Sequence, residues 1–126
     1  MEKAERDPQT ESIIACAIEV HKELGPGLLE SIYESAMALE LGSRGIRFLR
    51  QLQLPVLYKG TRIDGTLRVD LLVEDSVVVE VKCVDQLLPV HAAQVLSYMR
   101  LGGWSKGLLM NFKVANLAGG IRRLML

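Results

Sequence analysis

Residues 67–84 have the sequence LRVDLLVEDSVVVEVKCV, in which a short polar break separates two apolar runs. The β-branched residues on both sides of the polar break Glu74-Asp75-Ser76 predict a β-hairpin. One carboxylate lies in each run, Asp70 in the first and Glu80 in the second, and Lys82 follows two residues after Glu80. Asp is disfavoured within strands, and burying its charge is costly unless a partner compensates it. A charge kept at this place therefore needs a partner.

The length of the loop decides whether the two carboxylates meet. With a three-residue loop Val73 lies opposite Val77, and counting back places Asp70 opposite Glu80 on the same face. Two neighbouring carboxylates repel each other unless a cation lies between them, and Mg²⁺ takes oxygen ligands of this kind. A two-residue loop would put the carboxylates on opposite faces. From the hairpin alone, two interpretations remain open: a metal site, and a half-exposed hairpin whose polar residues face water.

Length and composition limit the class of protein. We expect the 126 residues to form one domain, residues 1–126, because the length and the 49% hydrophobic content are enough for a core. No apolar run approaches the roughly 20 residues of a membrane span, and the charged N-terminus is not followed by a signal-peptide core. Cys16 and Cys83 lack zinc-type spacing and are too few for a disulfide framework. We expect buried, reduced thiols in a cytoplasmic protein.

The net charge is zero, but the charges are unevenly distributed. Residues 1–40 hold three basic and nine acidic residues. Residues 86–126 hold no acidic residue and five basic ones: Arg100, Lys106, Lys113, Arg122 and Arg123. A segment of one sign can contact a polyanion, or it can dock on an acidic segment of the same chain or of a second subunit. We favour docking, because five charges are a weak signal for a polyanion.

Apolar spacing and terminal residues predict three helices. The first begins near Asp7-Pro8 or Thr10 and ends at Gly25-Pro26-Gly27. The second runs over residues 28–41 and ends at Gly42 or Gly45, and the third covers residues 90–101 before Gly102-Gly103. For the second helix, the spacing predicts an apolar face made of Leu29, Ile32, Tyr33 and Ala36.

The remaining segments predict strands. Extended segments are expected over residues 46–54 and 56–63, with Pro55 at an edge or bulge and Lys59-Gly60 as a turn. A further strand is expected over residues 107–112, and the structure of residues 120–126 remains undetermined. No GxSxG, GxxxxGK[ST] or GxGxxG motif indicates a hydrolase elbow or a nucleotide-binding loop.

Helix-borne polar residues give further candidates with two interpretations each. Glu30 either reaches a metal centre on the sheet or is an ordinary glutamate near a helix start, and taken alone the second is favoured. His91, Gln94 and Tyr98 share one helix face, which either contacts and stacks on nucleic acid or is a plain surface anchored by the tyrosine. For His91 and His21, packing or capping is favoured over metal binding, since no ligand spacing accompanies them.

These pieces occur in an order that resembles a known family. A helix glutamate, a hairpin with Asp70 and Glu80-Val81-Lys82, and a helix with Gln94 and Tyr98 resemble the PD-(D/E)XK nuclease superfamily. More narrowly, Gly27-Leu28-Leu29-Glu30-Ser31-Ile32-Tyr33 resembles the signature of its small GxxExxY proteins. The segments EVHKELGP over residues 19–26 and PVHAAQ over residues 89–94 are similar to that family too. One departure is Val69, which stands where the superfamily name has Pro.

The resemblance implies a fold and a site. The fold is an α/β, restriction-endonuclease-like αβββαβ core with a mixed central sheet flanked by helices. Asp70, Glu80 and the Val81 carbonyl would bind Mg²⁺ (or Mn²⁺), and Lys82 would position or help activate the attacking water. Glu30 would complete the catalytic site. Gln94 and Tyr98 match a motif of the exonuclease and recombination-associated branches and would contact nucleic acid.

Two functions follow from the resemblance. The first is a metal-dependent nuclease acting on DNA in repair, recombination or defence. The second is a non-catalytic module of nuclease-like fold that binds nucleic acid or a protein partner, as a homodimer for example. Retention of Asp70, Glu80 and Lys82 together favours the nuclease, whereas the zero net charge leaves room for the module.

Overall fold

The computed structural model describes residues 7–126. Its helices are α1 (Pro8–Leu24), α2 (Glu30–Ser43) and α3 (Pro89–Gly102), and a short 3₁₀ helix, η2, covers Leu117–Gly120. The strands are β1 (Phe48–Tyr58), β2 (Thr61–Val73), β3 (Val77–Lys82), β4 (Lys106–Asn111) and β5 (Ile121–Met125). The charged segment 1–6 lies outside the described residues.

The strands form one mixed sheet in the order β1-β2-β3-β4-β5. β3 and β4 are parallel and are joined through α3, whereas the other neighbours are antiparallel. A helix, three antiparallel strands, a crossover helix and a further strand form the expected restriction-endonuclease-like core. α1 and β5 extend this core, and the expected α/β fold is confirmed.

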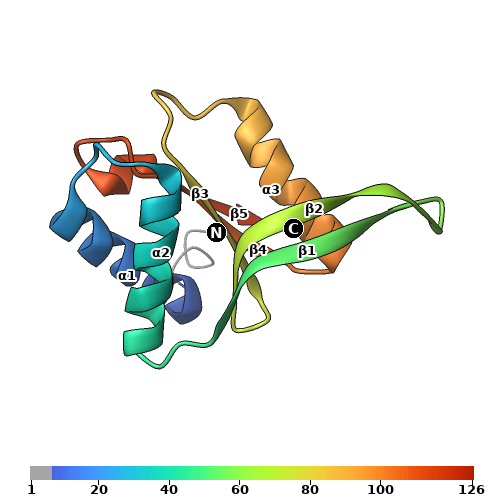
Figure 1. Ribbon diagram of the computed structural model, residues 1–126, viewed down its shortest axis with the longest axis horizontal. Coiled ribbons are helices and arrows are strands. Elements are labelled where there is room, and N and C mark those ends of the chain that lie inside the picture. The colour runs from blue at the N-terminus through green and yellow to red at the C-terminus, as the bar shows by residue number, and fades with distance from the viewer. Residues whose placement is uncertain (1–6) are drawn as a thin grey trace.

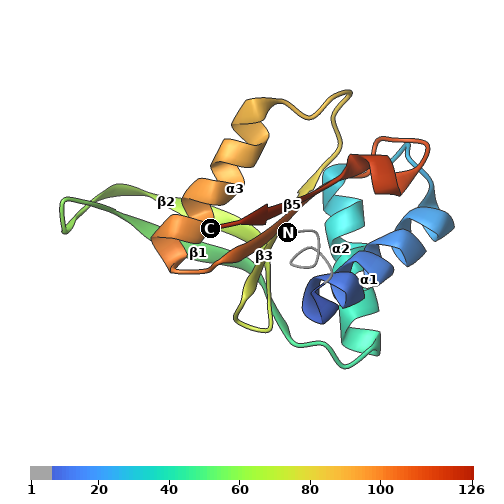
Figure 2. The ribbon, with the colours of Figure 1, turned by 180° about the vertical axis from the view of Figure 1, so that it is seen from behind.

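Helices cover both faces of the sheet (Figures 1 and 2). α1 and α2 pack on one face, and their cluster includes Val77 and Val79 of β3. α3 packs on the other face, and its cluster includes Val78 of the same strand. Successive residues of a strand point to opposite faces, so a strand with helices on both sides is apolar at nearly every position. Glu80 is the exception in the middle of β3.

The helix boundaries follow the expected end signals. The Asp7 side chain accepts a hydrogen bond from the Thr10 amide and begins α1, which ends at Gly25 with a φ of 74°. α3 ends at Gly103 in the left-handed conformation. The expected apolar face of α2 is only partly right. Tyr33 is buried, but Leu29 is 70% exposed, and Met37 and Leu41 are buried instead.

β1 and β2 form a long hairpin, which we call the arm; it extends away from the rest of the molecule (Figure 1). The expected turn at Lys59-Gly60 is confirmed, and both residues have positive φ values of 51° and 82°. The expected extended segment over residues 56–63 is confirmed on both sides of this turn, which divides the segment between β1 and β2. Pro55 lies on the edge strand β1, where the register shifts between Pro55 and Leu57, as its missing amide predicted.

The arm changes the face that it buries halfway along its length. Phe48 and Leu71 pack on the α1 and α2 side, whereas Leu52 and Val69 pack on the α3 side. In both strands the period of two is broken by one residue, Gln51 in β1 and Asp70 in β2. Gln51 has a φ of 56°, a left-handed conformation that is uncommon for a residue other than glycine. The switch thus coincides with Asp70.

The undetermined C-terminal segment is ordered. Residues 117–120 form η2 and residues 121–125 form β5 on the sheet edge. Cys16 is buried, as expected, whereas Cys83 is half-buried, and neither forms a disulfide. Within residues 7–126, no helix has the length and apolar character needed to cross a membrane.

Docking of basic C-terminal residues on acidic N-terminal residues is also observed. Lys106 lies 2.9 Å from Asp7, and Arg123 lies 2.6 Å from Glu11. These ion pairs join β4 and β5 to the start of α1. Part of the positive charge of the basic C-terminal segment is therefore neutralised by acidic residues of the same chain.

Candidate active site

The β2–β3 hairpin brings Asp70 and Glu80 together. Its loop has three residues, because Val73 pairs with Val77, and the backbone pairing continues to Leu71 opposite Val79. Beyond this pair, carboxylate side chains accept the amides of the facing strand in place of backbone carbonyls. Glu80 Oε1 accepts the Asp70 amide at 3.0 Å, and Asp70 Oδ2 accepts the Val81 amide at 2.9 Å.

Burial leaves both carboxylates short of compensating charge. Glu80 is only 4% exposed, and Asp70 is half-buried. Desolvation is the main reason that the pKa of Glu80 is raised to about 8. The neighbouring charge of Asp70 also contributes to this rise, and its effect is larger than the opposite effect of Lys82. Desolvation likewise raises the pKa of Asp70 to about 6, against the lowering effect of the Val81 amide. Such a pair takes up either a proton or a cation.

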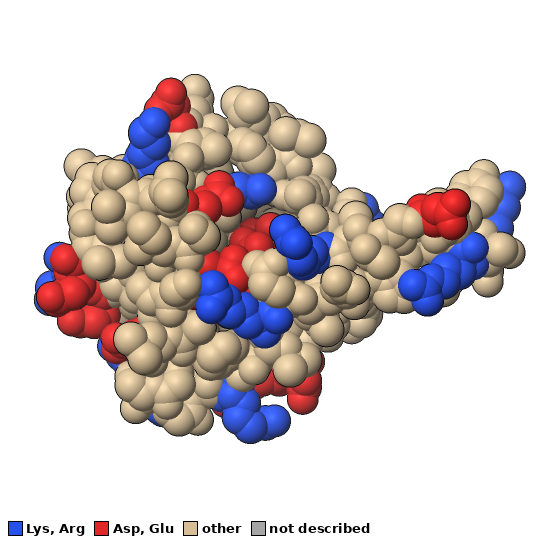
Figure 3. All heavy atoms as spheres, in the orientation of Figure 1, with Lys and Arg blue, Asp and Glu red and all other residues tan. Residues whose placement is uncertain are grey.

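The two carboxylates lie in a cleft of about 380 Å³ between α2 and α3. Figure 3 shows acidic atoms in this hollow and basic atoms on its rim. The cleft brings together the side chains that sequence analysis selected from four different elements: Glu30, Asp70, Glu80, Lys82, Gln94 and Tyr98. The Val81 side chain packs with the α1 and α2 cluster instead, so that only its backbone is directed to the site.

Glu30 reaches the end of β3 from the first turn of α2. Its Oε2 atom accepts the Cys83 amide at 3.1 Å, one residue beyond Lys82. The approach of α2 is fixed by Tyr33, which stacks on Phe112 with ring centroids 4.7 Å apart. The Tyr33 hydroxyl donates to the Gly25 carbonyl and accepts the Leu28 amide. Tyr33 thus ties the loop before α2 to the core, and Glu30 is placed one turn away.

Lys82 stands at the mouth of the cleft with its ammonium group uncommitted. Among residues 7–126 it forms no ion pair, although its charge lowers the pKa of both Asp70 and Glu80. Its backbone is held on the other side, where the Lys82 carbonyl accepts the Phe112 amide at 2.9 Å. Lys82 is therefore a cation placed beside two carboxylates and open to a ligand.

Gln94 and Tyr98 line the opposite wall of the cleft. Gln94 Nε2 donates to the Tyr98 hydroxyl at 3.0 Å. Tyr98 is only 7% exposed and packs in the α3 cluster, so its ring face is covered and the stacking on a base has no support. What remains at the cleft is the polar end of this pair, which can bond to a phosphate oxygen.

The two histidines lie outside the site and have structural roles. His91 Nδ1 accepts the Leu88 amide at 2.9 Å at the start of α3. His21 is buried, and its Nε2 lies 2.8 Å from the Val114 carbonyl oxygen. Capping and packing were the favoured interpretations, and both are confirmed.

Sequence analysis missed a second group of residues next to the carboxylates. Glu34 is buried on α2, lies 2.7 Å from Arg50 Nε and accepts two hydrogen bonds from Gln51 Nε2 at 2.8 and 2.6 Å. Its charge raises the pKa of both Asp70 and Glu80. The signal for Glu34 was its spacing of four from Glu30, which puts both on one helix face. Nothing in the sequence indicated the left-handed turn at Gln51.

The carboxylate oxygens in the cleft are suitable ligands for a hard divalent cation. No group of three or more His, Cys, Asp or Glu side chains among residues 7–126 is arranged to hold a metal. However, each carboxylate uses only one oxygen for a backbone amide, and Asp70 Oδ1 and Glu80 Oε2 have no partner within this range. Mg²⁺ is commonly held by one or two carboxylates and completes its shell with water and phosphate oxygens.

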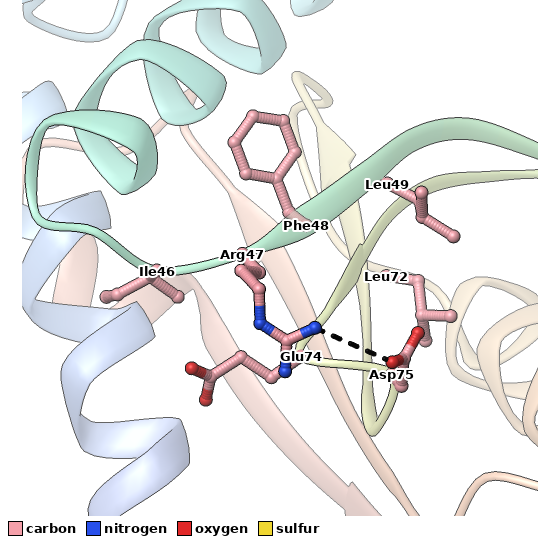
Figure 4. A pocket seen from close by; sticks show the side chains of 7 residues that line it. All are labelled: Ile46, Arg47, Phe48, Leu49, Leu72, Glu74 and Asp75. Carbon is pink, nitrogen blue, oxygen red and sulfur yellow. Dashed lines mark ion pairs between the residues drawn. The ribbon is translucent and has the colours of Figure 1, made fainter.

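A second hollow lies near the β2–β3 turn and offers no comparable chemistry. It is lined by residues 46–49, Leu72, Glu74 and Asp75 (Figure 4). Its one ion pair joins Arg47 to Asp75 at 3.9 Å, and both side chains are about three-quarters exposed, at 77% and 74%. Exposed pairs of this kind contribute little, so the hollow carries no site.

Comparison with models of known protein families identifies a superfamily. A family model described as the PD-(D/E)XK nuclease superfamily matches residues 7–124. The match covers nearly all of the described chain, including both carboxylates, Lys82 and α3. Comparisons with curated proteins and with solved structures gave no match.

Proposed function

Because this chain belongs to the PD-(D/E)XK nuclease superfamily, we propose that it is a metal-dependent nuclease that hydrolyses phosphodiester bonds in DNA. The observation that carries the proposal is the buried carboxylate pair, with Glu80 and Asp70 in contact with each other's strand. Desolvation raises the pKa of both carboxyl groups by more than the charge of Lys82 lowers it, and a bound cation would offset this cost.

Mg²⁺ or Mn²⁺ would be held by Asp70 and Glu80, with the Val81 carbonyl as a third ligand. Bound there, the ion would supply a Lewis acid for a phosphate oxygen and lower the pKa of a water molecule. Lys82, whose ammonium group is uncommitted, orients that water and balances the negative charge that develops on the phosphate. Glu30 completes the acidic side of the cleft from α2.

Gln94 and Tyr98 bind the DNA backbone in this proposal. Their polar ends line the cleft opposite the carboxylates, while the Tyr98 ring is held in the core. Contacts of this kind position a strand without reading its sequence. Cleavage is therefore expected to be independent of sequence.

We also propose that the chain is one of the small GxxExxY proteins. In this proposal it acts in DNA repair, recombination or defence. The support is structural: Tyr33 anchors the loop before α2, and Glu30, at the start of α2, lines the cleft. The glutamate and the tyrosine of the signature thus have separate physical tasks.

The first test is calorimetric titration of Mg²⁺ and Mn²⁺ into the protein and into Glu80→Gln. We expect saturable binding that Glu80→Gln abolishes, because a neutral amide replaces one of two charged ligands. The matched control is Glu74→Gln, which makes the same change at an exposed residue of the β2–β3 turn. Cleavage of plasmid, linear duplex and single-stranded DNA is then compared for the three proteins.

The outcomes separate the two functions. Metal binding and DNA cleavage that are both lost in Glu80→Gln, and retained in Glu74→Gln, support the nuclease. Binding of DNA that needs neither metal nor Glu80, without cleavage of any substrate, contradicts it and leaves the non-catalytic module.

A further inference from the structure

The distal part of the arm is exposed on all sides. Residues 57–66 are exposed throughout, and Leu57 and Tyr58 at the end of β1 are 55% and 61% exposed. Only the proximal part is packed, through Leu52, Leu54 and Leu67 on the α3 cluster. A hairpin of two strands is marginally stable at best when nothing covers it. The arm therefore presents an extended surface to a partner.

The charge of the arm is positive. From Phe48 to Val69 it contains four basic residues and one acidic residue, Asp64, in a chain whose net charge is zero. Arg50 is paired with Glu34, but Lys59, Arg62 and Arg68 form no ion pair among residues 7–126. Figure 3 shows basic atoms along the arm on the same face as the acidic hollow. Arg68 lines the cleft, so the row of charges starts at the site.

We propose that the arm is a second DNA-binding element, which lies along duplex DNA as it leaves the cleft and contacts phosphates through Lys59 and Arg62. This inference rests on the proposed function, because the cleft defines where the DNA starts. A two-stranded β-ribbon fits the major groove of B-form DNA, and basic side chains at its tip meet the backbone on the groove's edge. The exposed Tyr58 ring lies beside this tip, with the Lys59 ammonium 5.5 Å from its centre.

The length of β2 sets the reach of the arm. Arg62 and Asp70 belong to the same strand, and the eight steps between them span about 26 Å at the rise of an extended chain. This length corresponds to about 8 base pairs at 3.4 Å each. A duplex that ends nearer than this to the cleft cannot contact the tip. The proposal therefore predicts that duplex length decides whether the tip contributes to binding.

The test compares binding of a long and a short duplex by fluorescence anisotropy in Ca²⁺. The long duplex has about 24 base pairs, and the short one is a hairpin-closed duplex of about 6 base pairs, below the reach of the arm. The variant is Lys59→Gln/Arg62→Gln. The matched control is Lys22→Gln/Arg122→Gln, which removes the same two charges from exposed positions on α1 and β5, away from the arm.

Loss of two phosphate contacts lowers the affinity for the long duplex about 30-fold at 0.15 M salt, and the slope of log K against log salt decreases by about 2. The short duplex binds the tip variant and the unsubstituted protein equally, and the control variant behaves like the unsubstituted protein with both duplexes. Equal losses with both duplexes, or an equal loss in the control, would overturn the proposal.

Two further outcomes assign the arm to another partner and overturn the proposal. If the substitutions in the tip variant weaken binding of a single strand of about 24 nucleotides as much as binding of the long duplex, the arm does not specifically recognise a duplex. If the tip variant changes the mass of the protein in solution, measured by sedimentation, the arm is a contact between two copies of the chain.

The failure of this inference is distinguishable from failure of the proposed function. Cleavage and metal binding that depend on Glu80, with no effect of the tip variant on either duplex, leave the nuclease intact and remove the arm. A length-dependent effect of the tip variant in a protein that cleaves nothing establishes the arm without the nuclease.

Discussion

Burial raises the pKa of both Asp70 and Glu80, although each carboxylate accepts a backbone amide of the neighbouring strand, which acts in the opposite direction. Their pKa values of about 6 and about 8 lie above the ordinary 3.8 and 4.5. Between these limits the folded protein holds protons that the unfolded chain has already lost. The contribution of the pair to stability is therefore complete below about pH 4 and is lost as pH rises through about 8.

We expect the urea midpoint of the metal-free protein to decrease when the pH is raised from 5 to 8, because the carboxyl pair of the folded protein loses its protons over this range. Mg²⁺ added at pH 8 raises the midpoint again, since it binds the folded state. In Glu80→Gln the fall is smaller, because the amide stays neutral. An equal fall in Glu80→Gln, measured in the same chelator-treated buffers, would contradict the pKa assignment.

Among the elements, the β2–β3 turn carries a local strain that a single substitution relieves in part. Glu74 and Asp75 have φ values of 52° and 56°, and the Ser76 amide donates to the Val73 carbonyl at 3.0 Å. Two positive φ values in such a turn match type I′, which prefers glycine at its second central position. Asp75→Gly is expected to raise the free energy of unfolding by about 0.5–1 kcal/mol, since its exposed pair with Arg47 contributes little.

The measurement for Asp75→Gly is urea unfolding, with Thr66→Gly as the control. Thr66 is an exposed residue of β2 with an ordinary strand conformation, where glycine adds flexibility to the unfolded chain without relieving strain. Thr66→Gly should therefore lower the stability. If the free energy of unfolding changes in the same direction in both variants, the turn is not strained.

In the molecule as a whole, β3 and β4 lie in both apolar clusters and join α1 and α2 to α3. Gly107 of β4 marks the closest approach of α3, because a Cβ there would lie 2.6 Å from Met99 Sδ and 2.9 Å from Val95 Cγ1. Gly107→Ala is expected to lower the free energy of unfolding by about 1–3 kcal/mol through overpacking. The control, Gly42→Ala on α2, meets nothing within 4 Å and should be neutral or stabilising.

Because both clusters share these strands, Gly107→Ala should shift the whole unfolding transition. Trp104 fluorescence reports the α3 side, and far-ultraviolet circular dichroism reports all helices. We expect the two signals to move together. A shift in fluorescence alone would show that the two clusters unfold separately.

Most of the fold and of the carboxylate pair could be predicted from local signals. Apolar periodicity and caps act over a few residues, so the hairpin itself follows from the chain. The meeting of Asp70 with Glu80 was predicted only for a three-residue loop, and the pairing of Val73 with Val77 establishes that loop. The same holds for the turn at Lys59-Gly60 and for the ends of α1 and α3. The metal site and the catalytic roles remain predictions.

Other features depend on packing between distant segments. The buried face of α2, the change of face at Gln51 and the burial of Glu34 arise because the arm must leave one core and join the other, a demand that no local pattern expresses. The covered ring of Tyr98 has the same cause, since α3 lies on the sheet there. Local sequence thus sets which elements form and which residues share a strand. The packing of helices on both faces of one sheet sets which of those residues reach the cleft.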